Sequence, residues 1–386
     1  MRHNKKKLVM AALCILVFLV GLQCRAKETA TNSSVSSIPT TIQKAYGLIY
    51  FSKRGDANNF ENRGFGGLYF TNLATGEEQA LTTASDVSQN EGFSWSSITR
   101  RLIFSGKGEN NAEDRNLFTV DLNGSINQLS NGEIYDSRGR WSSDGQMIVF
   151  KSFRPDDYIL YIMDANGSNV RPVFDKDREF FIGNEFEWAP NNQRLAVSII
   201  PDDTLPVNLD APLSNLVIVD LESEKSSIQF SADHIRTDFS WSHDGSKLVF
   251  LSNPVEVNSS VRVSTAIYVF DFQSKEESLV VEFKVIGTPV WSPIEDVIAF
   301  SAAKPEETDE LNVYLINSDG TGLMQLTDNA AYRVSSWSPD GTKLAVEILS
   351  ERLTDYEIGI FDINNRTLER VTDNEVFDAF PIWIEL

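Results

Sequence analysis

Short apolar runs recur along the chain at a regular interval, and almost all of them follow a tryptophan. The seven tryptophans are spaced 46, 47, 53, 50, 46 and 46 residues apart. They are Trp95, Trp141, Trp188, Trp241, Trp291, Trp337 and Trp383. Nine residues after each of the first six, an apolar run ends, as at Phe104 and Phe250. Such runs are typical of buried strands, and a repeat of this length is typical of propeller blades.

Each repeat predicts four strands. The first ends at the tryptophan, the second is the apolar run, and the third ends in Asp or Asn before a turn and a fourth strand. These third-strand ends are Asn72, Asp121, Asp164, Asp220, Asp271, Asn317 and Asp362. The turn after the tryptophan reads Trp-Ser-Pro-Asp-Gly at 337–341, with close variants at 241–245 and 141–145. Asp bonds local backbone and Gly supplies positive φ, so we expect these aspartates to be structural rather than metal ligands.

The repeat count predicts an all-β fold, a seven-bladed β-propeller with four antiparallel strands per blade. The run from Leu48 to Phe51 has no tryptophan before it, and Trp383 has no strand after it. Residues 379–384 can supply the missing first strand of the blade that begins at Leu48. We therefore expect the C-terminal strand to pair into the first blade and close the ring.

Two segments carry a family resemblance. They are Ser-Ser-Trp-Ser-Pro-Asp-Gly-Thr-Lys-Leu-Ala-Val at 335–346 and Ile-Asn-Ser-Asp-Gly-Thr-Gly-Leu-Met-Gln-Leu-Thr-Asp at 316–328. Over residues 46–386 the repeat resembles the TolB-like, or WD40-like, β-propeller family, which implies a periplasmic or surface binding propeller. The chain departs from TolB itself, whose propeller mostly has six blades and follows an α/β domain. The turns at 95–99, 188–192 and 291–295 also lack Asp-Gly.

The N-terminal segment predicts export. Residues 1–7 are basic, and Leu8 to Leu22 is a 15-residue apolar run, shorter than the roughly 20 residues of a spanning helix. We expect a lipoprotein-like signal peptide at 1–23, a Ser/Thr-rich linker at 24–45 and the propeller at 46–386. Cys24 is the candidate lipidation site, with cleavage after Ala26 or an uncleaved anchor as alternatives. Each places the body in the periplasm or at the cell surface.

Charge narrows the range of partners. The net charge is −21, and it becomes −25 without residues 1–23. So acidic a chain repels phosphate backbones, which disfavours nucleic acid. The charge serves solubility, and Ca²⁺ is compatible with it although no motif indicates a metal. Cys14 and Cys24 both precede the propeller, which excludes disulfide and thiolate chemistry there.

Variable loops predict the binding face. From the second-strand end to the third-strand Asp or Asn there are 21, 17, 14, 23, 21, 17 and 16 residues, whereas the turns after the tryptophans are constant. Function concentrates in loops that differ on a fixed scaffold. Loops at 53–66, 199–214 and 251–266 carry apolar side chains for ligand contact or loop packing. These side chains include Phe60, Phe65, Pro201 and Pro206.

Charged residues that enter the first strands surround the predicted channel mouth on that face. They are Glu91, Asp136, Arg138, Glu185, Arg236, Asp238, Arg333 and Asp378. Arg holds carboxylate or phosphate, and the acids bind amines or Ca²⁺. Solvated rim charges and mutual salt bridges are the alternative interpretation of this mixed set.

Catalytic motifs are missing from the sequence. The only histidines are His3, His234 and His243, and neither a Gly-x-Ser-x-Gly elbow nor a His-Glu-x-x-His motif occurs, which disfavours serine and zinc hydrolysis. We expect a monomeric, non-enzymatic binding or scaffold propeller for a protein or glycan partner. It would need no cofactor and would touch the membrane only through its N-terminal tether. The alternatives are a polysaccharide-active hydrolase or lyase that uses channel-mouth carboxylates, and a spacer without a ligand.

Overall fold

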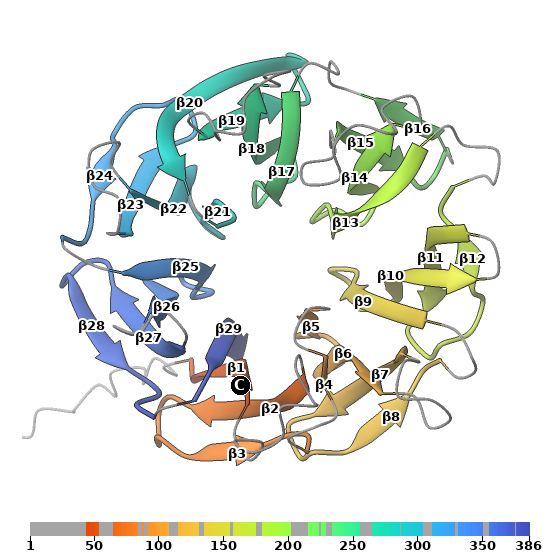
Figure 1. The fold of residues 1–386 in the computed structure, drawn as a ribbon, viewed down its shortest axis with the longest axis horizontal. Helices are drawn as coiled ribbons and strands as arrows, with labels where there is room; N and C mark the ends of the chain where they lie inside the picture. The colour runs from red at the N-terminus through yellow and green to blue at the C-terminus, as the bar shows by residue number, and fades with distance from the viewer. Residues whose placement is uncertain are drawn as a thin grey trace, which may run out of the picture. The chain divides into compact units, whose positions relative to one another are not determined.

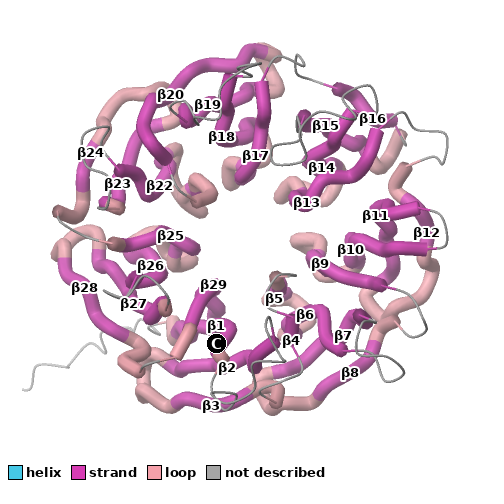
Figure 2. Tube along the Cα trace, in the orientation of Figure 1, coloured by secondary structure: helices cyan, strands magenta, loops and turns pink. Residues whose placement is uncertain are grey.

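The computed structural model describes most of the chain from Lys44 onward. The described ranges are 44–53, 65–83, 87–88, 92–107, 115–130, 135–154, 157–174, 180–201, 215–223, 225–228, 234–254, 265–285, 287–303, 311–328, 331–349, 355–374 and 376–386. Lys44–Leu386 forms one compact unit. Within these ranges the regular structure is all β-strand (Figure 2), as the sequence predicts. None of the described residues forms a helix long and apolar enough to cross a membrane.

The largest sheet holds 13 strands, the first twelve and the last one. They are β1 (Tyr46–Ser52), β2 (Phe65–Asn72), β3 (Glu78–Ala80), β4 (Val87–Ser88), β5 (Phe93–Ser96), β6 (Arg101–Lys107), β7 (Arg115–Asp121), β8 (Ile126–Gln128), β9 (Tyr135–Trp141), β10 (Met147–Arg154), β11 (Asp157–Asp164), β12 (Arg171–Pro172) and β29 (Asp378–Glu385). Antiparallel ladders divide this sheet into three sets of four strands. The sets are β29, β1, β2 and β3; β5 to β8; and β9 to β12. Short ladders through β4, and one parallel pair between β7 and β9, link these sets.

The remaining strands form three further sheets. They are β13 (Phe180–Trp188), β14 (Arg194–Pro201), β15 (Asn215–Asp220) and β16 (Lys225–Ile228); β17 (His234–Trp241), β18 (Lys247–Pro254), β19 (Thr265–Asp271), β20 (Glu276–Val285), β21 (Val290–Trp291), β22 (Val297–Ala303), β23 (Asn312–Asn317) and β24 (Met324–Gln325); and β25 (Tyr332–Trp337), β26 (Lys343–Leu349), β27 (Tyr356–Asp362) and β28 (Thr367–Arg370). Among the described strands, only β13–β16 and β25–β28 stand as separate four-stranded sheets, and no sheet closes on itself.

The strand sets of Lys44–Leu386 lie around a central opening (Figure 1). The strands that end at or near a tryptophan face this opening. We call them the inner strands: β5, β9, β13, β17, β21, β25 and β29. The sequence predicts this order, because the first strand of each repeat ends at its tryptophan. Every inner strand is therefore a potential contributor of side chains to the opening.

The C-terminal strand pairs with the first strand, as the unmatched Trp383 predicts. In the β1–β29 ladder Leu48 lies opposite Trp383, and a register shift follows Ile49. Hydrogen bonds at both ends extend the contact, from the Leu386 amide to the Ala45 carbonyl (3.0 Å) and from the Lys53 amide to the Phe377 carbonyl (3.1 Å). The two ends of the described chain are thereby held together by backbone hydrogen bonds.

The tryptophans pack between neighbouring strand sets. Trp188 is 5% exposed and belongs to a core cluster that contains side chains of β10, β11 and β13 to β15. Its indole nitrogen donates to the carbonyl of Arg140 on the preceding inner strand (3.1 Å). Trp337 donates in the same way to the Val290 carbonyl (3.0 Å). The tryptophan thus links two sets by apolar packing and by a hydrogen bond to backbone.

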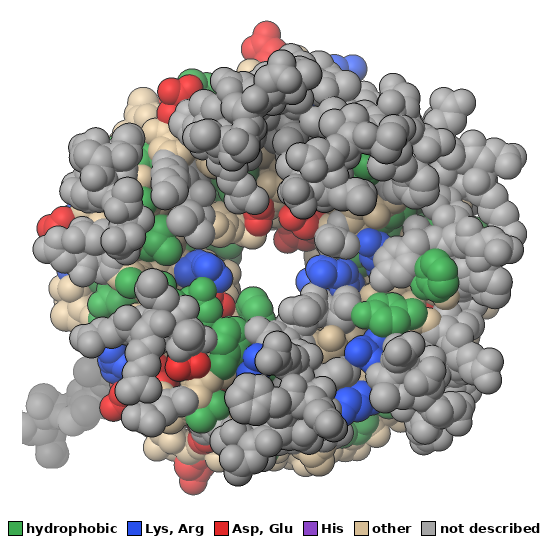
Figure 3. Space-filling view, in the orientation of Figure 1, with side chains coloured by type: hydrophobic (Ala, Val, Ile, Leu, Met, Phe, Trp, Pro, Cys, Tyr) green, Lys and Arg blue, Asp and Glu red, His purple; other side chains and the backbone are tan. Residues whose placement is uncertain are grey.

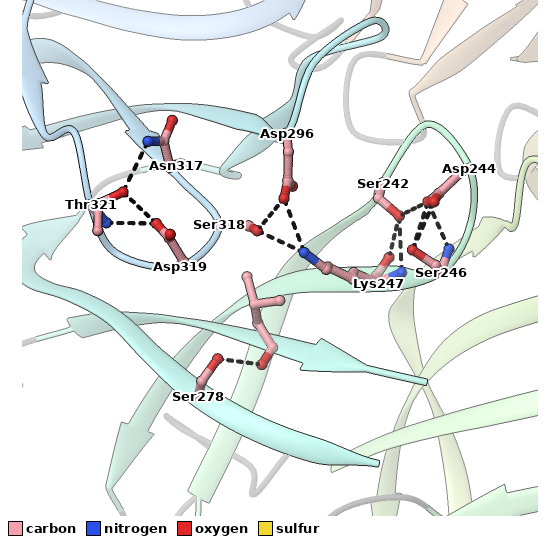
Figure 4. Close-up of polar contacts among 11 residues, drawn as sticks. Ser242, Asp244, Ser246, Lys247, Ser278, Asp296, Asn317, Ser318, Asp319 and Thr321 are labelled. Carbon is pink, nitrogen blue, oxygen red and sulfur yellow. Dashed lines mark hydrogen bonds and ion pairs between the residues drawn. The ribbon is translucent and has the colours of Figure 1, made fainter. Parts of the chain in front are cut away.

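The turns after the tryptophans are built by their own side chains (Figure 4). The Ser242 hydroxyl donates to Asp244 (2.7 Å), and Asp244 also accepts from the Ser246 amide (2.9 Å). Gly245 follows with φ of 69°. The Ser242 hydroxyl lowers the pKa of Asp244 to about 2, with help from Ser246. Through these bonds Asp244 holds the backbone of its own turn.

One lysine joins two neighbouring turns. Lys247 on β18 contacts Asp296 (3.0 Å) and Ser318 (3.0 Å), which belong to the next repeat (Figure 4). The Ser318 hydroxyl also donates to Asp296 (2.7 Å). Polar side chains therefore connect adjacent sets on the face that carries these turns.

Candidate functional site

The inner strands contain bulges three residues before several tryptophans. Arg138, Asp238 and Phe380 all have positive φ, at 56°, 52° and 59°, and Gly92 has φ of 63° at the same place. The ladders of β9, β17 and β29 shift register there. A bulge re-aims the side chain of the residue it inserts. Residues at this position therefore leave the simple alternation of a strand.

A pocket of about 400 Å³ lies along the inner strands β9, β13 and β17 and the segment 288–290. Most of its lining residues stand one or three positions before a tryptophan, and the others include aromatic neighbours. The lining residues are Ser94, Arg138, Arg140, Trp141, Ser143, Glu185, Phe186, Glu187, Trp188, Asp238, Phe239, Ser240, Thr288 and Val290. Figure 3 shows both basic and acidic side chains at the border of the central opening.

Three of the predicted channel-mouth residues come together in this pocket: Arg138, Glu185 and Asp238. The backbone amide of Asp238 donates to Glu185 Oε2 (2.6 Å). Thr288 donates from its hydroxyl to Asp238 Oδ1 (3.1 Å). Burial raises the pKa of Glu185 to about 7, the nearby Asp238 charge adds to the rise, and the amide bond and Arg138 oppose it.

Two further charged residues, Arg140 and Glu187, line the pocket, and the sequence did not predict either of them. Burial raises the pKa of Glu187 to about 7, against the charge of Arg140. Each stands directly before a tryptophan, where the sequence pattern predicts the end of a strand and nothing about a site. The available signal was the recurrence itself, since Ser94, Ser240 and Val290 hold the same place and line the same pocket.

The predicted residues five positions before a tryptophan are buried and contact polar partners within the fold. Asp136 is 2% exposed and accepts a hydrogen bond from Ser152. Arg236, also 2% exposed, is ion-paired with Glu277 (3.1 Å). Asp378 is fully buried and accepts from the Asn374 amide group (2.8 Å). These three side chains brace the inner strands from within and do not line the pocket.

Arg333 lies outside the pocket as well and makes an internal ion pair. Its guanidinium contacts Glu347 (3.3 Å) and donates to the Tyr356 hydroxyl (3.1 Å). Burial raises the pKa of Glu347, which also accepts from the Phe380 amide on β29 (2.8 Å). This arrangement fits the predicted alternative of mutual salt bridges, and it ties β25 and β26 to the C-terminal strand.

Several predicted residues fall outside the described part of the structure. Glu91 and Cys24 do so, as do the side chains of Phe60, Phe65, Pro201 and Pro206. Among the residues that the structure does describe, no group of three or more His, Cys, Asp or Glu side chains is arranged to hold a metal ion. The chemistry visible in the pocket is that of guanidinium, carboxyl and hydroxyl groups over aromatic rings.

Comparisons with known proteins reveal similarity of fold. No family model and no curated protein matches the chain. Among solved structures, a puromycin-hydrolyzing peptidase from Mycobacterium tuberculosis is 13% identical with a TM-score of 0.56, over 74% of this chain and 47% of that one. A putative 6-phosphogluconolactonase from Bacteroides uniformis is 10% identical with a TM-score of 0.55, over 89% and 100%. TolB from Acinetobacter baumannii is 12% identical with a TM-score of 0.48, over 72% and 63%.

Proposed function

We propose that Lys44–Leu386 is a seven-bladed β-propeller of TolB-like repeats, in which β29, β1, β2 and β3 form the blade that closes the ring. The tryptophan period, the four-strand repeat and the β1–β29 ladder support this blade count. The arrangement of the strand sets around an opening agrees with it (Figure 1). Closure through a terminal strand leaves no unpaired edge in such a ring.

We infer that this propeller is a binding module whose ligand enters the pocket of the inner strands. The observation that carries the proposal is the joining of Arg138 and Arg140 with Glu185, Glu187 and Asp238 in one cavity of about 400 Å³. Guanidinium groups hold anionic oxygens, and carboxyl groups accept from hydroxyl or ammonium groups. A cavity of this size accommodates a side chain or one to two sugar units. The ligand is a protein or glycan at the cell envelope.

The N-terminal segment supports a location outside the cytoplasm. A basic start, an apolar run of 15 residues and Cys24 directly behind it are the elements of an export signal with a lipid attachment point. We propose that the propeller is exported and tethered through Cys24, with residues 24–45 as a linker. Mass spectrometry of the mature N-terminus tests this, because a lipidated Cys24 and a chain that begins after Ala26 differ in mass. A chain that still carries residues 1–23 would contradict both forms of cleavage.

The test of the binding function is affinity capture from envelope extract with the purified chain and two matched variants. Glu185→Gln removes one ionisable carboxyl group from the pocket but keeps an acceptor for the Asp238 amide. Glu369→Gln makes the same change at an exposed position on β28. We expect one partner to be enriched by the wild type and by the Glu369 variant and to be lost with the Glu185 variant. Equal recovery with all three would contradict binding at the pocket.

A second function, cleavage of a glycan, is favoured by one specific observation. Glu185 has its pKa raised to about 7 beside the second carboxyl of Asp238. An acid that keeps its proton near neutrality next to another carboxylate suits glycoside cleavage by hydrolysis or elimination. Incubation with a mixture of bacterial and plant oligosaccharides, analysed for shortened products, tests this. Product formation that Glu185→Gln abolishes would establish it, and absence of any product would reject it.

A further inference from the structure

Gly92 occupies the bulge position of the inner strand segment before Trp95, and its missing side chain has a specific neighbour. Its φ is +63°, and a Cβ placed there would lie 2.8 Å from Nη2 and 3.3 Å from Nη1 of Arg140. The guanidinium therefore occupies the space that any other residue at position 92 would fill. The equivalent positions in β9 and β17 carry Arg138 and Asp238, so the glycine is not required by the repeat.

Arg140 is held at its backbone and at the end of its side chain. Its backbone carbonyl accepts the indole hydrogen bond of Trp188 (3.1 Å), and its Nη1 donates to the Gly139 carbonyl (3.1 Å). With Gly92 against its tip, the guanidinium is confined beside the pocket that it lines. A long side chain loses rotamer freedom when it binds a ligand, which costs entropy. Confinement of the side chain in the free protein lowers this entropic cost of binding.

The same relation between a glycine and an arginine of the next repeat occurs once more among the described residues. Gly287 has φ of +95°, and a Cβ there would lie 3.3 Å from Cγ and 3.5 Å from Cδ of Arg333. That arginine is ion-paired with Glu347 inside the fold (3.3 Å), and Arg140 lines the pocket. In both places a glycine without a Cβ leaves room for an arginine of the next repeat.

We propose that Gly92 is a positioning residue of the pocket, which by lacking a Cβ lets the Arg140 guanidinium lie in place to bind an anionic group of the ligand. The inference rests on the proposed binding function and adds the chemistry of the group recognised. An anionic oxygen pair, as in a carboxylate or phosphate, matches the planar fork of a fixed guanidinium.

The test compares Gly92→Ala with Gly76→Ala. Both glycines have positive φ, but at Gly76, with φ of +73°, no atom lies within 4 Å of the position that a Cβ would take. Both variants therefore carry similar backbone strain, and only one displaces Arg140. The displaced atoms are the flexible end of a side chain, so the Gly92 variant is expected to fold. The first readout is the pKa of Glu187, which Arg140 lowers. This pKa is measured by NMR titration of the carboxyl carbons.

We expect Gly92→Ala to raise the pKa of Glu187 by about half a unit or more, and Gly76→Ala to leave it unchanged. In an Arg140→Gln background the Gly92 substitution should add nothing further. An unchanged titration in Gly92→Ala, an equal shift in Gly76→Ala, or a further shift without Arg140 would each overturn the positioning role.

The second readout is capture of the envelope partner, and it separates this inference from the proposed function. We expect Gly92→Ala and Arg140→Gln each to weaken the captured partner's affinity by about tenfold, with Gly76→Ala equal to wild type. If Glu185→Gln loses the partner while Arg140→Gln and Gly92→Ala retain it, the pocket binds but the anionic contact is wrong. If no pocket variant affects capture, the proposed binding function itself fails.

Discussion

Replacement of Glu185 by glutamine should make the protein more stable at alkaline pH and leave it unchanged at acidic pH. Burial moves the pKa of this carboxyl from 4.5 to about 7 in the folded state. Folding therefore favours the protonated form, and this contribution is complete below pH 4.5 and is lost as pH rises through about 7. The difference between the folded and unfolded pKa values corresponds to a loss of about 3 kcal/mol in unfolding free energy at pH 8 to 9. This is an upper value, because the side chain keeps some solvent contact.

Glutamine is neutral at every pH and still offers an oxygen to the Asp238 amide. The assay is thermal and urea-induced unfolding of wild type, Glu185→Gln and the exposed control Glu369→Gln at pH 5, 6, 7 and 8. We expect a gain for Glu185→Gln that grows with pH to a few kcal/mol, equivalent to roughly 3 to 4 °C in a protein of this size. An equal effect at pH 5 and pH 8, or a gain of the same size in Glu369→Gln, would contradict a raised folded-state pKa of Glu185.

Three further substitutions or deletions test the scaffold. Trp188→Phe should lower the unfolding free energy by about 1 kcal/mol more than Trp141→Phe. The reason is that the Trp188 indole donates to a carbonyl, while that of Trp141 has no hydrogen-bond partner in the described residues. Equal losses in denaturant melts would contradict a stabilising hydrogen bond from Trp188 to the neighbouring strand. Asp244→Asn should lower the unfolding free energy by under about 1 kcal/mol after solvent screening. The loss should appear only above the folded-state pKa of Asp244, about 2, so the melting temperatures of wild type and variant should converge as pH falls toward 2. Deletion of 377–386 removes β29 and should abolish the cooperative thermal transition, and an unchanged transition would refute closure by the C-terminal strand.

The repeat could be predicted from the sequence because its signals are local. The tryptophan stands at or near the end of each inner strand, and the Ser-x-Asp-Gly turn carries its own hydrogen bonds, so both can be predicted from residue type and spacing. The β1–β29 contact was also predictable, since an unmatched Trp383 and a first run without a tryptophan complete each other. These features need no knowledge of which side chains meet across the opening.

The pocket could be predicted only in part, because three of its charged residues were singled out and two were not. The bulges at Arg138 and Asp238 insert a residue into a strand, and a simple alternation pattern does not reveal such insertions. Burial of Asp136, Arg236 and Asp378 depends on partners far away in the sequence, such as Glu277 for the arginine. Among the charged residues of β9, β13 and β17, those one or three positions before the tryptophan line the pocket, and those five positions before it are buried in the fold.

Hydrogen exchange of the chain, with and without its captured partner, shows directly whether the partner binds at the inner strands. We expect the partner to slow exchange at the pocket segments 135–141, 180–188 and 234–241, which contain β9, β13 and β17. Outer strands such as β8, β12 and β28 should exchange at the same rate with and without the partner. Protection confined to those outer strands, with unchanged exchange at the inner segments, would contradict a binding site in the central pocket.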